Sequence, residues 1–490
     1  MLLGIVAGLA CTATGCTWVS DTKEQPKLSG SIKVVYWNKN SFMQNYGNLF
    51  SVKYPDLTVE VLPLEGLYKP QQDNKKAFDD YVQLHNPDVL LLDSEQFERY
   101  AGSGKLKALD ADMKKDAFDT KGYYSGVLEY LRRAGDGKIY GFAPFFNCEA
   151  VFYNKKLFAE HGVPFPGNKM SWNELILLSQ RFSTQNEDPP VYGLEGRTLT
   201  NPFIFATTVG ASYGLKYLDP ESKKMTLNTP EWAKVFKLVA EAFQKGNFYK
   251  ADPASGPKPS PGSKREEVLK QQYPFLNGHI AMTIQGVDFV DVLSTTPGLP
   301  FEWDLVTVPV DQSNPNSGNS MSVNEIFSVN VNSQNPAASW KFIEYINSDA
   351  FARIMTKSTI KALPARVNAA PKEERNVKAF YELTPPNESM YKNFDKLPDS
   401  FLMTFDSIIN QEMEPLLQGK STAETALQRI EARSQAELDK PKDENPGSEK
   451  LVLEISCESG EGDLHEVSGF QRRGNAGSNR SVLRGAYGIA

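Results

Sequence analysis

The chain is poor in the two residue types that most often bind transition metals or form disulfide bonds, with four cysteines and four histidines among 490 residues. Cys11 and Cys16 fall near the N-terminus. Cys148 and Cys457 are too few and too far apart in sequence to form a disulfide framework, and the apolar surroundings of Cys148 favour a small buried side chain. The histidines are scattered, which disfavours a His-based metal site. We therefore expect no metal and no cofactor.

A basic excess and long hydrophobic segments are also absent. The formal net charge is −7, whereas general nucleic-acid binding requires a basic face. Beyond residue 15, no apolar run is long enough to span a bilayer. We expect neither a nucleic-acid partner nor a permanent membrane span.

Motifs of common enzyme classes are missing as well. Neither a G-x-S-x-G nucleophile elbow nor a zinc-protease helix occurs in the sequence. Residues 101–107 superficially resemble a phosphate-binding loop, but Arg99 stands where the first glycine belongs and Leu106 replaces the Ser or Thr. Carboxylates are plentiful, so composition leaves a glycosidase pair open without singling one out. We expect a protein that is not an enzyme.

The N-terminus indicates where the protein works. Residues 1–15 form an apolar run of small residues, too short for a permanent membrane helix and typical of a cleaved export signal. The next residue, Cys16, follows Ala13-Thr-Gly, which resembles a lipobox in which the cysteine becomes the acylated (palmitate-type) first residue of the mature chain. Ala13 stands where lipoproteins more often have Leu, and the start lacks a Lys or Arg. An ordinary secretory signal with an incidental cysteine is the alternative.

Both ends of the mature chain are predicted to lie outside the fold. Residues 16–30 are interpreted as the lipidated cysteine and a polar tether, with an r.m.s. reach of roughly 20 Å. An anchor with two acyl chains suffices for stable attachment, so we expect the protein at the outer face of the cell membrane, extracellular in a Gram-positive cell and periplasmic otherwise. Residues 441–490, rich in Gly, Ser, Asn and charge, are predicted to be a disordered tail.

Between these ends, strands alternate with helices. Strands are expected over residues 31–37, 57–62 and 88–93, and the third has the fully apolar middle of a buried parallel strand. Helical spacing separates them, which predicts an α/β fold with right-handed crossovers. Further along, a strand at 303–309 is expected to return the chain to the first lobe, and residues 398–438 are expected to form two helices.

The most specific stretch is residues 137–172, which read as strand, turn, strand, helix, stop and capped helix. Ser171 and Glu174 form the capping box that opens the last helix. This order resembles the segment where family 1 extracellular solute-binding proteins of ABC importers, the sugar type, cross between lobes. Residues 275–282 resemble that family's F-x-x-G-x-x-A-M strand entry, and residues 363–366 its LPAR turn. The resemblance covers about residues 31–440.

The resemblance implies a type II periplasmic-binding-protein-like clamp, an α/β fold of two lobes. Each lobe would contain a mixed or parallel sheet flanked by helices, and about three crossover segments would join them. We expect residues 31–143 plus 305–347 in the first lobe, and 144–304 plus 348–440 in the second. The implied protein is a monomeric lipoprotein that captures a sugar or oligosaccharide in the interlobe cleft and delivers it to the membrane permease. Closure requires ligand contacts that favour the closed state.

A sugar site needs aromatic faces for the C–H side of the ring and planar polar groups for the hydroxyls. In open α/β sheets a ligand lies beyond the carboxyl ends of strands. There the first lobe offers Trp37 and Asn38 after the first strand, and Asp93 after the third. A buried core position for Trp37 and a helix-capping role for Asp93 are the alternatives.

The crossing segment and the second lobe add further candidates. Polar residues inside an apolar run must find partners, either at the cleft or in a hinge hydrogen bond. Residues 282–289 resemble the family's G-x-W turn with Asp288 in place of the Trp, and residues 318–325 resemble its glycine-rich cleft loop. For Tyr213 core packing is the alternative, and for Arg366 a structural salt bridge. The expected ligand-binding residues from these segments are Phe146, Asn147, Glu149, Tyr213, Gln285, Asp288, Phe289, Asn324, Glu325 and Arg366.

Three other functions stay open at this point. The same fold could receive a non-sugar solute such as iron, a polyamine or a phosphate compound. A secreted carbohydrate-active enzyme would be distinguished by turnover of a glycoside. A sensor partner of a membrane kinase would bind the same ligand without transport.

Overall fold

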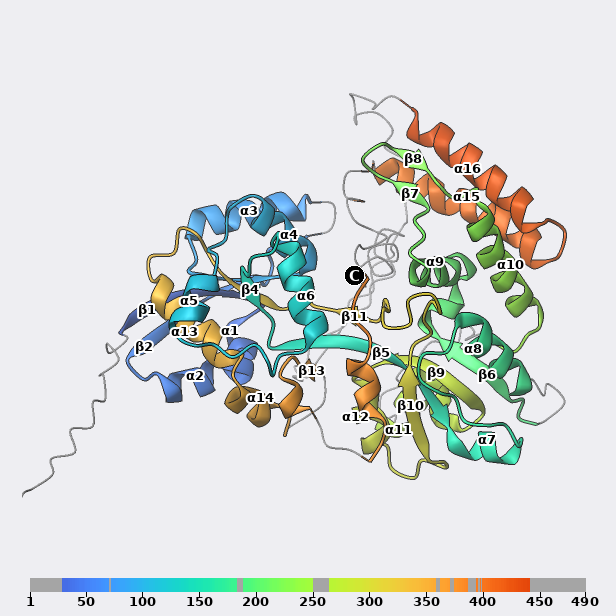
Figure 1. The fold of residues 1–490 in the computed structure, drawn as a ribbon, viewed down its shortest axis with the longest axis horizontal. Helices are drawn as coiled ribbons and strands as arrows, with labels where there is room; N and C mark the ends of the chain where they lie inside the picture. Colours follow the sequence, from blue (N-terminus) through green and yellow to red (C-terminus); the bar gives the residue numbers. More distant parts are fainter. Residues whose placement is uncertain are drawn as a thin grey trace, which may run out of the picture.

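A computed structural model of the chain describes residues 29–69, 72–182, 188–249, 264–357, 362–370, 374–386, 394, 397 and 399–440. The expected export signal, the candidate acylation site Cys16, almost all of the tether and the tail at 441–490 lie outside the described residues. Within the described part, no helix is both long and apolar enough to cross a membrane. Figure 1 shows two lobes side by side, with β5 running between them.

The first lobe is built on a five-stranded sheet of order β2-β1-β3-β12-β4. β1 is parallel to both β2 and β3, whereas β12 is antiparallel to β3 and β4. All four residues of β3 are buried, as the apolar run predicts. The strands are β1 (Gly30–Tyr36), β2 (Leu57–Pro63), β3 (Val89–Leu92), β4 (Gly141–Phe142) and β12 (Ile326–Val329).

Helices cover this sheet, and their apolar faces form one core with it. Their order along the chain alternates with the strands, which confirms the α/β class. They are α1 (Lys39–Phe42), a π-helical turn (Met43–Gly47), α2 (Asn48–Lys53), α3 (Asn74–His85), α4 (Ser94–Gly102), α5 (Asp110–Lys115), α6 (Ser125–Ala134), α13 (Pro336–Ile346) and α14 (Asp349–Met355).

The second lobe contains a mixed sheet with the path β10-β5-β9-β6. β5 is antiparallel to both β10 and β9, and β6 is parallel to β9. The strands are β5 (Phe145–Asn154), β6 (Tyr192–Gly196), β9 (Ile280–Gly286) and β10 (Trp303–Thr307), with a small separate hairpin of β7 (Leu218–Asp219) and β8 (Lys224–Met225).

Most helices of the second lobe enclose a second core, whereas Phe289, Val290 and Leu293 pack in the cluster that continues from the first lobe. The capping box predicted at Ser171 and Glu174 is present at the start of α8. The two helices expected over 398–438 are α15 and α16. The helices are α7 (Lys155–Glu160), α8 (Trp172–Ser179), α9 (Pro202–Ser212), α10 (Pro230–Gln244), α11 (Arg265–Gln272), α12 (Phe289–Thr295), α15 (Asp399–Leu417) and α16 (Ala423–Leu438).

Strand β5 also holds together the segments that pass between the lobes. Its first half pairs with β11 (Met321–Ser322) and β13 (Leu363–Pro364). Its second half pairs with β9 and β10, inside the sheet of the second lobe. Three stretches of chain distant in sequence therefore cross between the lobes next to one another (Figure 1), in agreement with the expected crossovers.

Two of the expected lobe boundaries need correction. The strand at 303–309 was expected to return the chain to the first lobe, but β10 pairs with β5 in the second sheet, with Trp303 opposite Asn154. Residues 349–355 were assigned to the second lobe, but Phe351 of α14 stacks on Tyr46 of the first, with ring centroids 5.7 Å apart. An apolar pattern identifies a strand or helix without saying which sheet it joins. The other boundaries stay predictions.

Candidate functional site

The carboxyl edge of the first sheet brings three of the predicted residues together. Trp37 and Asp93 follow β1 and β3, which are parallel neighbours and end at the same edge. β12 runs the other way, with Ile326 opposite Leu92, so Glu325 enters the sheet at this edge too. Trp37 is 46% exposed, which rules out the alternative of a buried core residue. Its ring is available to a ligand.

Asp93 and Asn38 cap helices at this edge. Asp93 Oδ1 accepts a hydrogen bond from the backbone N–H of Gln96 (2.8 Å) in a full capping box at α4. Asn38 Oδ1 accepts one from the N–H of Ser41 (2.9 Å) at α1. The capping alternative for Asp93 is therefore confirmed, although a carboxylate has acceptor capacity beyond one cap bond.

The protein around Asp93 changes the pKa of its carboxyl group. The residue is solvent-exposed, and yet desolvation by the surrounding protein raises the pKa of its carboxyl group, against the opposing effect of the Gln96 backbone hydrogen bond.

Glu325 is held by two tyrosines. Tyr46 Oη donates to Glu325 Oε2 (2.7 Å) and Tyr36 Oη to Oε1 (3.2 Å), while Asn45 Nδ2 donates to Tyr36 Oη (3.2 Å). Burial, with the charge of Glu325 second, raises the pKa of both tyrosines, which keeps them protonated as donors. Sequence reasoning missed Asn45, Tyr36 and Tyr46 because both tyrosines read as ordinary core residues.

Asn45 and Tyr46 lie in the π-helical turn, a geometry that is frequent at functional sites. Gly47 ends the turn under close packing, because a Cβ there would lie 2.6 Å from Met43 Sδ and 2.9 Å from a Phe42 ring carbon. The glycine thus leaves room for the side chains of Phe42 and Met43 in the preceding turn.

A second edge, in the other lobe, collects charged residues. Glu149 of β5 lies opposite Gly286 at the end of β9, and β6 ends at Gly196, beside Ile284 of β9. Arg197 and Asp288 therefore follow neighbouring strand ends. A Cβ on Gly286 would lie 2.7 Å from Asp288 Oδ1, so that carboxylate folds over the glycine. No strand was predicted at β6, so Arg197 was not among the predicted site residues.

Glu149 is a residue of this edge whose pKa responds to its surroundings. Burial raises the pKa of its carboxyl group, the charge of Arg197 opposes this, and the charge of Asp288 adds to it with a smaller effect. No described residue donates a hydrogen bond to the Glu149 side chain. Its neighbours along the strands are Asn147, which is exposed, and Gln285, whose Nε2 donates to Thr283 Oγ1 (3.1 Å).

Two predicted aromatic ligands are instead core residues. Phe146 is 1% exposed and stacks on Tyr124, with centroids 4.9 Å apart. Phe289, also 1% exposed, contacts the rings of Phe152 and Tyr273. A side chain enclosed by other rings has no face left for a ligand, so both predictions are wrong. Phe289 therefore does not supply a stacking ring in place of the Trp that Asp288 replaces.

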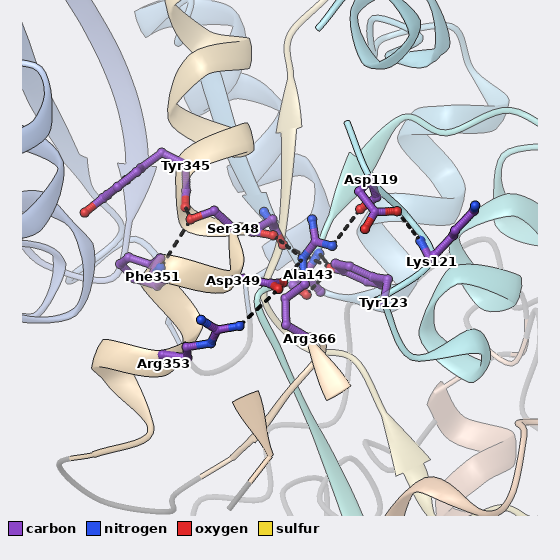
Figure 2. Close-up of polar contacts among 11 residues, drawn as sticks. Asp119, Lys121, Tyr123, Ala143, Tyr345, Ser348, Asp349, Phe351, Arg353 and Arg366 are labelled. Atoms are coloured by element: carbon purple, nitrogen blue, oxygen red, sulfur yellow. Dashed lines mark hydrogen bonds and ion pairs between the residues drawn. The ribbon is translucent and has the colours of Figure 1, made fainter. Parts of the chain in front are cut away.

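The side chain of Arg366 is also buried among protein groups and is not available to a ligand (Figure 2). It is 5% exposed. Its Nε donates to Asn347 O (2.6 Å) and its NH1 to Asp119 O (2.6 Å), and Asp349 Oδ1 lies 3.5 Å from Nε. Since backbone carbonyls and a carboxylate occupy the guanidinium, the salt-bridge alternative describes this residue.

The Arg366 cluster joins the crossing segments. Tyr123 Oη accepts from Ala143 N (3.2 Å), at the start of the first crossing, and lies 3.0 Å from Asn347 Oδ1 (Figure 2). Asn347 lies at the end of α13, before the last crossing, and Arg366 lies within that crossing. These contacts therefore tie the crossing segments to the first lobe.

Two predicted residues, Tyr213 and Asn324, remain to be placed. Tyr213 is half-buried at the C-terminal end of α9, where it packs against the second core, and burial raises its pKa. Asn324 is exposed between β11 and β12. Both stay predictions.

Other features of the described residues lie apart from these edges. A pocket of about 510 Å³ on the first lobe is lined by Asp110, Met113, Phe118 and Arg132, among others, and by none of the predicted residues. Among the described residues, no group of three or more His, Cys, Asp or Glu is arranged to hold a metal ion.

Comparison with known proteins adds three findings. A family model described as bacterial extracellular solute-binding protein matches residues 37–352. The sn-glycerol-3-phosphate-binding periplasmic protein UgpB of Rhizobium meliloti (strain 1021) is 23% identical over 369 residues, which cover 69% of this chain and 79% of that protein.

Solved structures share the fold at low sequence identity. The sugar-binding protein MalE from Xanthomonas citri superimposes with a TM-score of 0.60 at 17% identity, covering 84% of this chain and 97% of that one. The substrate-binding protein Lmo0181 from Listeria monocytogenes, in complex with cycloalternan, gives 0.54 at 20% identity, covering 84% and 99%. These likenesses confirm the two-lobed fold.

Proposed function

The chain belongs to the bacterial extracellular solute-binding proteins, and from this premise we propose that it captures a carbohydrate between its two lobes. The observation that supports a sugar is the exposed ring of Trp37, at the same sheet edge as Asp93 and Glu325. An aromatic face beside planar acceptors is the combination that a pyranose requires. The sugar and cycloalternan named for the two structural relatives agree with it.

The proposed mechanism is closure without catalysis. Trp37, Asp93 and Asn324 would contact the ligand from the first lobe, and Glu149, Gln285 and Asp288 from the second. Because β5 pairs with both other crossing strands, the lobes can bend about one common region. The ligand favours the closed form only by contacting both edges at once. That form would then deliver the ligand to the permease of an ABC importer.

Truncation of Trp37 tests the carbohydrate proposal. Wild-type protein is screened by thermal shift against mono- and oligosaccharides, and the shift should grow with the logarithm of free ligand concentration. Trp37→Ala should weaken binding of the sugar so identified by about 30-fold, because a truncated Trp anchor typically costs about 2 kcal/mol. Calorimetric titration measures the dissociation constant.

Phe165→Ala is the matched control, since Phe165 is also an exposed aromatic but packs beside Tyr153 at the far end of β5. It should bind like wild type. Absence of any shift across the panel would refute carbohydrate capture, whereas unchanged affinity in Trp37→Ala would refute only the stacking role.

We also propose that acylation of Cys16 anchors the mature chain at the outer face of the membrane, which the lipobox-like segment supports. Cys16→Ala should move the protein from the membrane fraction to the soluble fraction or the medium. Cys11→Ala, inside the expected signal, should leave it on the membrane. Fractionation and immunoblotting of cells that express each variant give the result, and membrane retention of Cys16→Ala would contradict the anchor.

A further inference from the structure

Each of the two edges carries more negatively charged than positively charged side chains. At the strand ends of the first lobe stand Asp93 and Glu325, with Lys39 as the cation of that segment. At those of the second lobe stand Glu149 and Asp288, with Arg197. Carboxylates outnumber cations on each side, so a ligand held between the edges meets excess negative charge from both.

Glu149 adds a requirement of its own. Glu149 is partly exposed where it lies opposite the end of β9, the protein around it raises the pKa of its carboxyl group by desolvation, and no described residue donates a hydrogen bond to it. Water can therefore reach this carboxyl group, and a ligand that displaces the water must supply a donor in its place. A ligand hydroxyl or ammonium group supplies a donor, whereas a phosphate or carboxylate would bring a second anion to the same place.

Arg197, the cation beside Glu149, does not outweigh the two carboxylates of this edge. Arg197 acts on Glu149 electrostatically, as Asp288 does with the opposite sign. Arg197 also interacts with groups of the protein in this structure. A phosphate group would have to compete with two carboxylates for that one guanidinium.

We infer that this site selects its solute by charge: it takes a neutral polyhydroxyl or amine-bearing ligand and rejects a phosphorylated one. The inference rests on the proposed function, since it assumes that the ligand lies between the two edges. It distinguishes this chain from what the name of UgpB, its relative at 23% identity, says of that protein.

Matched ligand pairs test this inference. Calorimetric titration compares glucose and glucosamine with glucose 6-phosphate, glycerol with sn-glycerol 3-phosphate, and the best sugar of the thermal-shift panel with its phosphate ester. Each phosphate should bind at least about 100-fold more weakly than its uncharged or amine partner. Discrimination should shrink as salt rises, because exposed charges are screened. A phosphate that binds as tightly as its partner overturns the charge selection while leaving solute capture intact.

Two variants locate the source of selectivity. Asp288→Asn should reduce the ratio between phosphate and neutral dissociation constants severalfold, and Glu149→Gln should do the same while also weakening the neutral ligand. Glu160→Gln, an exposed carboxylate on α7 beyond the far end of β5, should leave the ratio unchanged. An unchanged ratio in both edge variants overturns the inference. Failure of every ligand to bind wild type instead refutes the proposed function, and the inference falls with it.

Discussion

Arg366→Ala is expected to lower the free energy of unfolding by about 3–5 kcal/mol, because its buried guanidinium donates two charge-assisted hydrogen bonds, each worth about 1.5–3 kcal/mol. The substitution removes the donors to Asn347 O and Asp119 O and the cation that faces Asp349. Asn347 O then stays in the interior without this donor, whereas Asp349 is partly exposed and keeps Arg353 as a neighbour. Urea denaturation followed by circular dichroism measures the loss as a shift in midpoint at constant slope.

Arg353→Ala is the matched control, because it removes a guanidinium from the same carboxylate. Arg353 NH2 lies 3.6 Å from Asp349 Oδ2, but the arginine side chain is 61% exposed. An exposed pair within one helix is worth only a few tenths of a kcal/mol, so this variant should stay within about 0.5 kcal/mol of wild type. Equal, small losses in both variants would show that the buried contacts of Arg366 contribute nothing measurable to the free energy of unfolding.

Arg366 also shows where sequence reasoning stops. A family-like turn identified the residue, and an arginine in a turn suits a ligand hydroxyl as well as a carbonyl. The deciding fact is the position of Asn347 and Asp119, and Asp119 comes from a segment 247 residues away along the chain. Only the folded chain brings these partners together.

Features encoded by adjacent residues were predictable. The capping box at Ser171 needs only Glu174, three residues on, and the buried strand β3 needs only its own apolar run. The grouping of Trp37 and Asp93 needed one more rule, that parallel strands end at a common edge. Such predictions depend on local periodicity or on a general property of the fold.

Predictions that needed side-chain direction or long-range pairing failed or were missed. Phe289 lies one residue after Asp288, and that single step turns its ring into the core. The bond between Tyr36 and Glu325 spans 289 residues. The sheet of β10 was likewise undetermined, because an apolar strand fits either lobe equally well.

A second large effect is expected from Glu195, which no functional prediction used. Its Oε2 accepts a hydrogen bond from the N–H of Phe275 (3.2 Å) in the interior of the second lobe. Desolvation raises the pKa of its carboxyl group to about 7, against the effects of that bond and of Thr283. The group is therefore near its midpoint at neutral pH in the folded chain, whereas in the unfolded chain it is ionised above about pH 4.3.

The sign of the stability change follows from this difference. Below about pH 4.3 both states are protonated and Glu195 contributes no penalty. As pH rises toward 7, the unfolded state ionises and the folded state does not, so the free energy of unfolding falls by up to about 3 kcal/mol and then levels off. Glu195→Gln, which cannot ionise, should lose this part of the pH dependence and exceed wild type in stability at pH 8. Urea midpoints at pH 4.5, 6 and 8 measure it.

Glu174→Gln gives a control of opposite sign. The capping bonds from the Ser171 backbone and hydroxyl lower the pKa of Glu174, so its contribution is present above its unfolded pKa and is lost as pH falls. Its variant should therefore differ from wild type most at pH 8 and by destabilisation, whereas Glu195→Gln should differ there by stabilisation. Parallel pH curves for wild type and Glu195→Gln would contradict the buried titration. If the two curves diverge as expected, Glu195 carries an unfavourable charge inside the second lobe once the pH exceeds about 7. The end of β6, where Glu195 is followed by Gly196 and Arg197, would then become less stable as the medium turns alkaline.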